Sequence, residues 1–78
     1  MPVTVQELTD LIQTEFPGSN PLLADELNRI TGTIFWQSFE GMDISERNSL
    51  VTKKIRDNLG LSGMNVGILY PLVPGEVL

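Results

Sequence analysis

The sequence predicts a small α/β domain of the α+β type, in which two helices cover one face of a small mixed sheet. Two segments repeat apolar residues at helical spacing, and a run of β-branched and aromatic residues lies between them. A short apolar run follows the second helical segment. At 78 residues, 41% of them hydrophobic, the chain is long enough for one core. We therefore expect residues 1–78 to form a single domain.

The first helix is predicted over residues 4–16. Thr4 and Glu7 have the spacing of a capping box, in which the Thr4 hydroxyl accepts from the Glu7 amide and Glu7 reaches back. Apolar residues then recur at helical spacing, while the acidic residues turn away. These apolar residues are Val5, Leu8, Leu11, Ile12 and Phe16. Pro17 and Gly18 end the helix.

The segment of residues 19–29 favours neither a helical nor a strand period. Ser19, Asn20 and Pro21 are typical of a turn, and the Leu, Ala and Glu residues that follow prefer helix on intrinsic propensity. Only the wider order of elements favours a short edge strand, where Pro21 would be tolerated. From the residues alone, both conformations stay open.

Residues 30–38 predict a strand because they are rich in β-branched and aromatic residues. Alternation places Ile30, Ile34 and Trp36 on one face. We expect Trp36 to pack in the core. The alternative is that Trp36 and Tyr70 lie on the uncovered face of the sheet and mark a partner or dimer surface.

The second helix is predicted from Asp43, its N-cap, to Leu59, with Glu46 completing a second capping box. Gly60 is expected to end it in a left-handed conformation. The side chains that this helix is expected to bury are Ile44, Val51, Ile55 and Leu59. Residues 66–72 then predict a last strand, parallel to the strand of residues 30–38 because a helix connects the two.

Composition excludes several classes of function. Ten acidic against five basic residues give a net charge of −5, which disfavours nucleic-acid binding. The chain has no cysteine and no histidine, so disulfides, thiolate zinc sites and catalytic histidines are excluded. No secretory signal and no apolar run long enough for a membrane span is visible, and we expect a cytoplasmic protein.

No catalytic residues are predicted. Ser38, Ser45, Ser49 and Ser62 have no histidine to activate them, so they are interpreted as solvated side chains and caps. The carboxylates of Asp43 and Glu46 are explained by helix capping. We therefore expect a protein that is not an enzyme and has no cofactor.

Two surface patterns offer binding hypotheses. Gly60, Leu61, Ser62 and Gly63 match the GxxG loop with which KH domains clamp nucleotides, but their near neighbours are uncharged. Nucleic-acid binding through this loop is therefore an alternative function, not the expected one. The basic cluster of Lys53, Lys54 and Arg56 is interpreted as a solvated helix face. Its alternative role is docking an acidic partner surface.

Three short motifs in series resemble the BolA family over residues 30–76. The family's Phe-x-Gly stands here as residues 39–41, its Arg-His-x-Leu-Val as residues 47–51, and its closing Pro-x-Glu as residues 74–76. The resemblance implies an αββαβ module related to type II KH domains. It therefore implies an edge strand within residues 20–29 and a mixed three-stranded sheet.

The resemblance also implies a function. BolA proteins are partners of monothiol glutaredoxins in iron–sulfur trafficking, and in bacteria they act in transcription and cell shape. The family's cluster-ligating histidine at the start of the last strand corresponds to Asn65, and the Arg-His histidine to Asn48. Asparagine is a poor ligand for iron–sulfur centres. We therefore expect a BolA-like adaptor or regulatory protein that has lost its metal site.

The resemblance suggests roles for single residues. Phe39 is expected to fill the core, Gly41 to allow a turn, and Arg47 to hold the helix start against Glu76 or a C-terminal carbonyl. A partner surface is expected around the second helix and the last strand. Its candidate residues are Arg47, Asn48, Lys53, Lys54, Arg56 and Asn65. A homodimer that pairs through an exposed strand edge is a third hypothesis.

Overall fold

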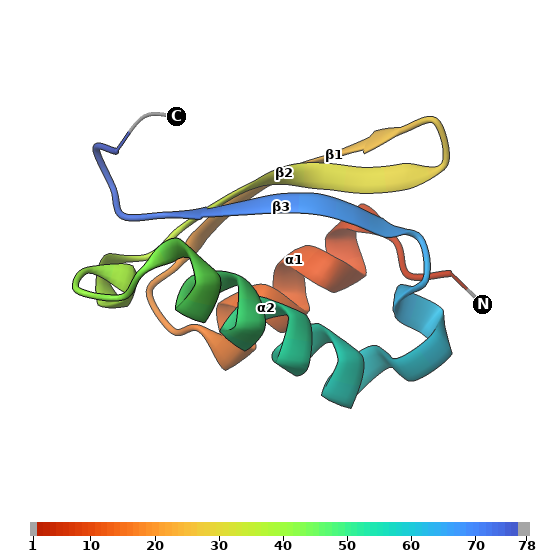
Figure 1. Ribbon diagram of the computed structural model, residues 1–78. Coiled ribbons are helices and arrows are strands. Elements are labelled where there is room, and N and C mark those ends of the chain that lie inside the picture. The colour runs from red at the N-terminus through yellow and green to blue at the C-terminus, as the bar shows by residue number, and fades with distance from the viewer. Residues whose placement is uncertain (1, 77–78) are drawn as a thin grey trace.

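The structure, a computed structural model, describes residues 2–76 and has two layers (Figure 1). The elements in chain order are α1 (Val5–Glu15), β1 (Asn20–Glu26), β2 (Arg29–Phe35), the 3₁₀ turn η1 (Gln37–Phe39), α2 (Ile44–Leu59), the 3₁₀ turn η2 (Gly60–Gly63) and β3 (Val66–Leu72). Both helices lie against the same face of the sheet. This arrangement confirms the predicted αββαβ fold with two helices on one face of a mixed three-stranded sheet.

The sheet has the strand order β1-β2-β3. Strands β1 and β2 are antiparallel, with Pro21 opposite Ile34 and Glu26 opposite Arg29. Strands β2 and β3 are parallel, as the helical connection predicts, and a register shift interrupts their pairing after Ile30. The edge strand implied by the resemblance is confirmed as β1. Pairing with β2 and burial of Pro21 outweigh the helix propensity of the segment.

Both helices begin at the predicted capping boxes. The Glu7 amide donates to the Thr4 hydroxyl at 3.1 Å, and the Glu46 amide donates to the Asp43 carboxylate at 2.8 Å. In both boxes the glutamate side chain also accepts from the cap amide. Helix α2 ends at Leu59 as predicted. Gly60 takes a positive φ of 54°, which glycine tolerates, but its ψ of −127° differs from the left-handed helical conformation expected there.

Two details of the prediction are wrong. The strand predicted over residues 30–38 ends at Phe35, and Gln37–Phe39 form η1 because the chain turns there to carry Phe39 into the core. Ile44, predicted to be buried, is 54% exposed. Ile44 is the first helical residue of α2, and the inward position of that turn belongs to Arg47, which is buried.

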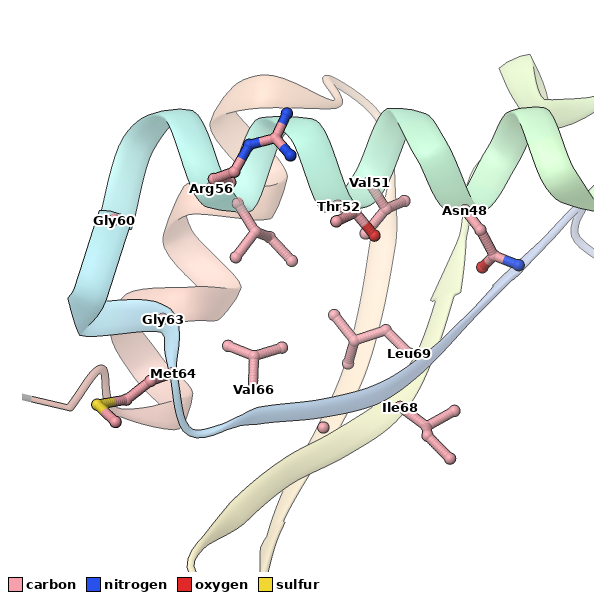
Figure 2. A pocket seen from close by; sticks show the side chains of 12 residues that line it. Asn48, Val51, Thr52, Arg56, Gly60, Gly63, Met64, Val66, Ile68 and Leu69 are labelled. Atoms are coloured by element: carbon pink, nitrogen blue, oxygen red, sulfur yellow. The ribbon is translucent and has the colours of Figure 1, made fainter.

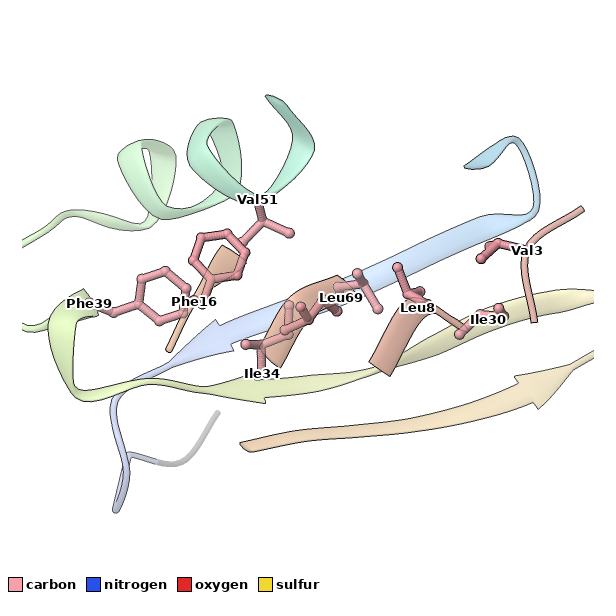
Figure 3. Close-up of a cluster of buried hydrophobic side chains, with 9 residues drawn as sticks. Val3, Leu8, Phe16, Ile30, Ile34, Phe39, Val51 and Leu69 are labelled. Carbon is pink, nitrogen blue, oxygen red and sulfur yellow. The ribbon is translucent and has the colours of Figure 1, made fainter. Parts of the chain in front are cut away.

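The core lies between the helices and the sheet (Figure 3). At one end of it, Phe16 of the loop after α1 and Phe39 of η1 are buried with ring centroids 6.2 Å apart. Trp36 packs edge-on against both rings, and its indole N–H donates to the Pro17 carbonyl at 2.9 Å. Trp36 is therefore part of this aromatic cluster, as expected, whereas Tyr70 is 41% exposed. The core role predicted for Phe39 is also confirmed.

The described helices carry no membrane-spanning segment. Within residues 2–76, neither the length nor the apolar character of any helix suits a bilayer crossing. Hydrophobic residues of α1 and α2 instead pack into the single core beneath the sheet.

Candidate functional site

An open groove of about 410 Å³ runs between α2 and β3 (Figure 2). We call it the α2–β3 groove. Its apolar floor combines Val51 and Ile55 of α2 with Val66 and Leu69 of β3. The side chains of Val66 and Leu69 point from β3 toward the helix, whereas Ile68 points away from it. Residues of η2 and Met64 close one end.

A strip of polar side chains lies along the helical side of this groove. Asn48, Thr52 and Arg56 follow one another at intervals of four residues, so the helical repeat places them on one face of α2. Within residues 2–76 none of these three side chains has a hydrogen-bond partner inside the chain. A shallow polar depression beside the groove adds Ser49 and Lys53 to the same strip. The strip is therefore free to bond to a partner.

The basic cluster of α2 divides between the groove and the rest of the surface. Lys54 turns toward α1, where its ammonium lies 3.4 Å from the Glu15 carboxylate. Lys53 pairs with Asp57 at 3.1 Å on the exposed side of the helix. Arg56 lines the groove, with a side chain that is 69% exposed and no carboxylate oxygen of residues 2–76 nearer than 4.0 Å. Arg56 is thus the cation best placed to contact a partner in the groove.

Asn65 is occupied by a contact with the N-terminal segment. Its side-chain amide donates to the Val3 carbonyl at 2.9 Å, and its side-chain carbonyl accepts from the Val3 amide at 3.3 Å. The Val3 amide also donates to the Ser62 carbonyl at 2.8 Å, and the Val3 side chain is buried. Both ends of the Asn65 amide are therefore used to hold the chain before α1 against the start of β3.

Arg47 is likewise occupied inside the fold. Its guanidinium donates to the Met42 carbonyl at 3.0 Å, to the Pro71 carbonyl at 3.2 Å and to the Glu76 carboxylate at 2.8 Å. The expected contact with Glu76 and a C-terminal carbonyl is confirmed. The pKa of Glu76 is lowered below its ordinary value, chiefly by the hydrogen bond from Arg47 and also by the one from the Val73 amide.

The GxxG residues form the turn η2 directly after α2. A Cβ at Gly63 would lie 3.3 Å from the Ile55 side chain, so the glycine lets this turn pack closely on the helix. Leu61 is 86% exposed, and the Ser62 carbonyl accepts from Val3. Both glycines have structural roles here, and nucleotide clamping stays an untested alternative.

An iron–sulfur cluster does not fit the residues of this site. The two positions that correspond to family histidines hold asparagines, one of which is bonded on both sides to Val3. The chain has neither histidine nor cysteine, and residues 2–76 contain no group of three acidic side chains placed to hold a metal ion. Amide oxygens are hard ligands that suit neither thiophilic iron nor sulfide-bridged clusters.

The structure brings Asn48 and Arg56 together in one groove, with Lys53 beside it. It places Lys54, Arg47 and Asn65 in intramolecular contacts instead. A partner contact stays a prediction for all six residues. The sequence reasoning missed Thr52, although its position midway between Asn48 and Arg56 at helical spacing was a usable signal.

No protein-family model matches the chain, and no curated protein sequence does. Among solved structures, BolA1 from Arabidopsis thaliana is similar, with a TM-score of 0.77 and 19% sequence identity over 100% of both chains. Likeness at this identity shows the fold. The chain therefore has a BolA-like fold, and the resemblance carried by the three motifs is confirmed at the level of the fold.

Proposed function

We propose that this protein is a non-enzymatic adaptor of the BolA type that binds another protein through the α2–β3 groove. The observation that carries the proposal is the groove itself, in which an apolar floor lies beside the polar side chains of Asn48, Thr52 and Arg56. An apolar centre with a polar rim is the usual anatomy of a protein interface. The fold provides the scaffold, and the groove provides the binding surface.

The side chains around the groove support binding rather than catalysis. Asn48, Thr52 and Arg56 supply hydrogen-bond donors, but none of them is a nucleophile activated by a neighbouring base. In the same proposal, the adaptor works without an iron–sulfur cluster, which the hydrogen bonds between the Asn65 side chain and the Val3 backbone support. We propose a cytoplasmic location for this activity.

A monothiol glutaredoxin is the first partner to test, on the strength of the BolA-like fold. The labelled protein is titrated with such a glutaredoxin while backbone amide shifts are followed. Shifts are expected along α2 and β3 around Asn48, Arg56 and Val66, and no absorbance band of a transferred cluster is expected. An unchanged spectrum at high glutaredoxin concentration contradicts this choice of partner.

A pair of charge reversals tests the location. Arg56→Glu places a carboxylate in the groove and is expected to weaken partner binding roughly tenfold. Lys54→Glu makes the same change in net charge on the side of α2 that faces α1, outside the groove, and is the matched control. Equal weakening by both variants would contradict binding in the groove, because it would reflect only the net charge.

A short single-stranded oligonucleotide titrated in parallel tests the KH-like alternative. Salt-sensitive shifts confined to Gly60–Gly63, and removed by Gly63→Asp, would favour nucleic-acid binding over the adaptor role. The adaptor proposal expects no such shifts, because the chain is acidic and η2 carries no basic residue.

A further inference from the structure

We propose that the tip of the β1–β2 hairpin, residues 25–28, docks into the α2–β3 groove of a second copy of this chain. The inference rests on the proposed function in one respect, since both use the groove as the docking surface. It adds an occupant that the chain itself supplies. The protein would then exist as a weak head-to-tail assembly that competes with partner binding.

The hairpin tip carries a large apolar side chain that is not buried within a single copy. Leu27 is 97% exposed, more than any other large apolar side chain of residues 2–76. Leu27 and Asn28 form a two-residue turn with φ values of 50° and 64°. Turns of this kind favour asparagine and glycine. Neither backbone conformation nor burial within one copy favours a leucine there, whereas insertion into a second copy would bury it.

Two carboxylates precede this leucine. Asp25 and Glu26 are both exposed, and within residues 2–76 neither makes a salt bridge or a side-chain hydrogen bond. The tip is thus an acidic pair followed by an apolar knob. Such a segment is complementary to a surface that combines a hydrophobic hollow with cations.

The α2–β3 groove has this complementary chemistry. Its volume of about 410 Å³ falls within the range of ligand pockets, about 300–1,000 Å³, so it has room for a leucine side chain. Arg56 lines the groove, and Lys53, which pairs with Asp57 at 3.1 Å, lies in the adjoining depression. Leu27 would contact the floor around Ile55 and Leu69, while the Glu26 carboxylate before it faces Arg56. Asp25 points to the other face of β1, because successive side chains of a strand alternate.

The topology makes the contact intermolecular. The hairpin tip lies at one end of the sheet, on the side away from the helices, and β2 lies between β1 and β3 (Figure 1). The tip and the groove are different surfaces, so their contact is heterologous and can repeat from copy to copy. Because it would bury much less than a standard interface, we expect a dissociation constant on the order of 1 mM.

Self-association is measured by sedimentation and by amide shifts over a concentration series up to about 1 mM, a range set by the expected affinity. Shifts are expected at the tip and along the groove together. Leu27→Asn removes the knob while placing a residue that the turn favours, so the variant is expected to stay folded and to associate roughly tenfold more weakly. A wild-type protein that stays monomeric, or a Leu27→Asn variant that associates normally, overturns the proposal.

Leu22→Asn is the matched control, because Leu22 is also exposed, at 55%, but lies in the middle of β1. This variant is expected to associate like the wild type. If it instead abolishes association, the interface lies on the sheet or its edge and the hairpin proposal is overturned.

A charge exchange tests the pairing of the two surfaces. Glu26→Lys and Arg56→Glu each place like charges at the contact, so each variant alone is expected to associate more weakly than the wild type. In a mixture, both kinds of contact between unlike copies are attractive: the reversed tip meets the reversed groove, and the unchanged tip meets the unchanged groove. The mixture is therefore expected to associate more strongly than either variant alone. A mixture no stronger than its components contradicts the docking arrangement.

Partner binding distinguishes this inference from the proposed function. Leu27→Asn leaves the groove intact, so it is expected to bind a glutaredoxin at least as well as the wild type. Self-association through the tip without any glutaredoxin binding would contradict only the choice of a glutaredoxin as partner. Glutaredoxin binding in the groove without self-association would contradict only the proposal that the hairpin tip docks into a second copy.

Discussion

At the scale of single residues, Arg47 holds together three parts of the chain. Its guanidinium meets carbonyls before α2 and in β3 and the Glu76 carboxylate beyond β3, and it lies 5.9 Å from the centroid of the Phe39 ring. A buried cation is tolerated only when its donors find acceptors, and here they do. The arginine therefore fixes the start of α2 against the end of β3.

The Arg47–Glu76 ion pair makes stability depend on pH. Because the folded state lowers the pKa of Glu76 below its ordinary value of 4.5, its contribution is present above that value and is lost as the pH falls through the folded pKa. Urea unfolding should show that the wild type has a larger free energy of unfolding than Glu76→Gln at neutral pH. This difference should disappear in acid. In an Arg47→Met background this difference should shrink to the smaller part that the Val73 amide hydrogen bond supports. A difference that persists in acid, or that is undiminished in that background, would contradict the ion-pair account.

Asn65 makes a contact that a smaller side chain cannot replace. Asn65→Ala removes two hydrogen bonds to the Val3 backbone, and we expect a loss of about 1–3 kcal/mol in the free energy of unfolding. Hydrogen exchange should accelerate at Val3 more than in β2. Asn58→Ala, which removes a hydrogen bond on exposed α2, is the control and should cost less. Unchanged exchange at Val3 would show that the Asn65 contact does not hold the N-terminal segment.

Arg47 and Asn65 also show which side-chain contacts can be predicted from the sequence. The Arg47–Glu76 contact was predictable because both residues belong to recognisable motifs. The Asn65 contact was not, because its partner is the backbone of Val3, 62 residues away in the sequence. Backbone atoms are the same in every residue, so no side-chain pattern marks them as a partner.

At the scale of elements, local sequence signals determine the helices, whereas pairing with a neighbouring strand determines β1. Both helices were predicted at nearly their observed limits because capping boxes and stop residues are local. Strand β1 could not be assigned from its own residues, since its conformation depends on pairing with β2. The groove was predicted only as a surface around α2 and β3, because its depth depends on how the two elements pack.

Gly32 is the residue on which the β1–β2 pairing depends most directly. Its φ is 154°, and an added Cβ would overlap the Leu22 carbonyl oxygen on the neighbouring strand. Gly32→Ala is therefore expected to lower the free energy of unfolding by about 2–4 kcal/mol, through overpacking and backbone strain. Urea unfolding measures the loss.

Gly41→Ala is the matched control for this substitution. Gly41 also has a positive φ, of 86°, but a Cβ there would meet no atom within 4 Å. Only backbone strain is added, so the expected loss is about 1 kcal/mol. Equal losses at the two glycines would show that the close approach of β1 to Gly32 is not what the sheet requires.

At the scale of the whole molecule, one aromatic cluster joins segments that are distant in the chain. Phe16 follows α1, while Trp36 and Phe39 connect β2 to α2, and the three rings lie with centroids 4.9–6.2 Å apart. Arg47, which lies at the same end of the core, donates a hydrogen bond to the Pro71 carbonyl of β3. The cluster therefore connects the helical layer to the sheet at one end of the molecule, and it helps to position α1, α2 and β3 relative to one another.

Phe39→Ala tests whether this cluster holds the whole fold. Phe39 has no exposed surface, and truncating such a phenylalanine costs about 3–5 kcal/mol. A domain of 78 residues has a total stability of only about 4–12 kcal/mol, so a large part of it should be lost. Trp36, the single tryptophan, packs on Phe39 and reports tertiary structure by fluorescence, while circular dichroism reports the helices. The two transitions should shift together to lower urea, and Phe39→Leu should shift less. Helices that survive after the Trp36 signal is lost would show that the cluster stabilises only its own end of the molecule.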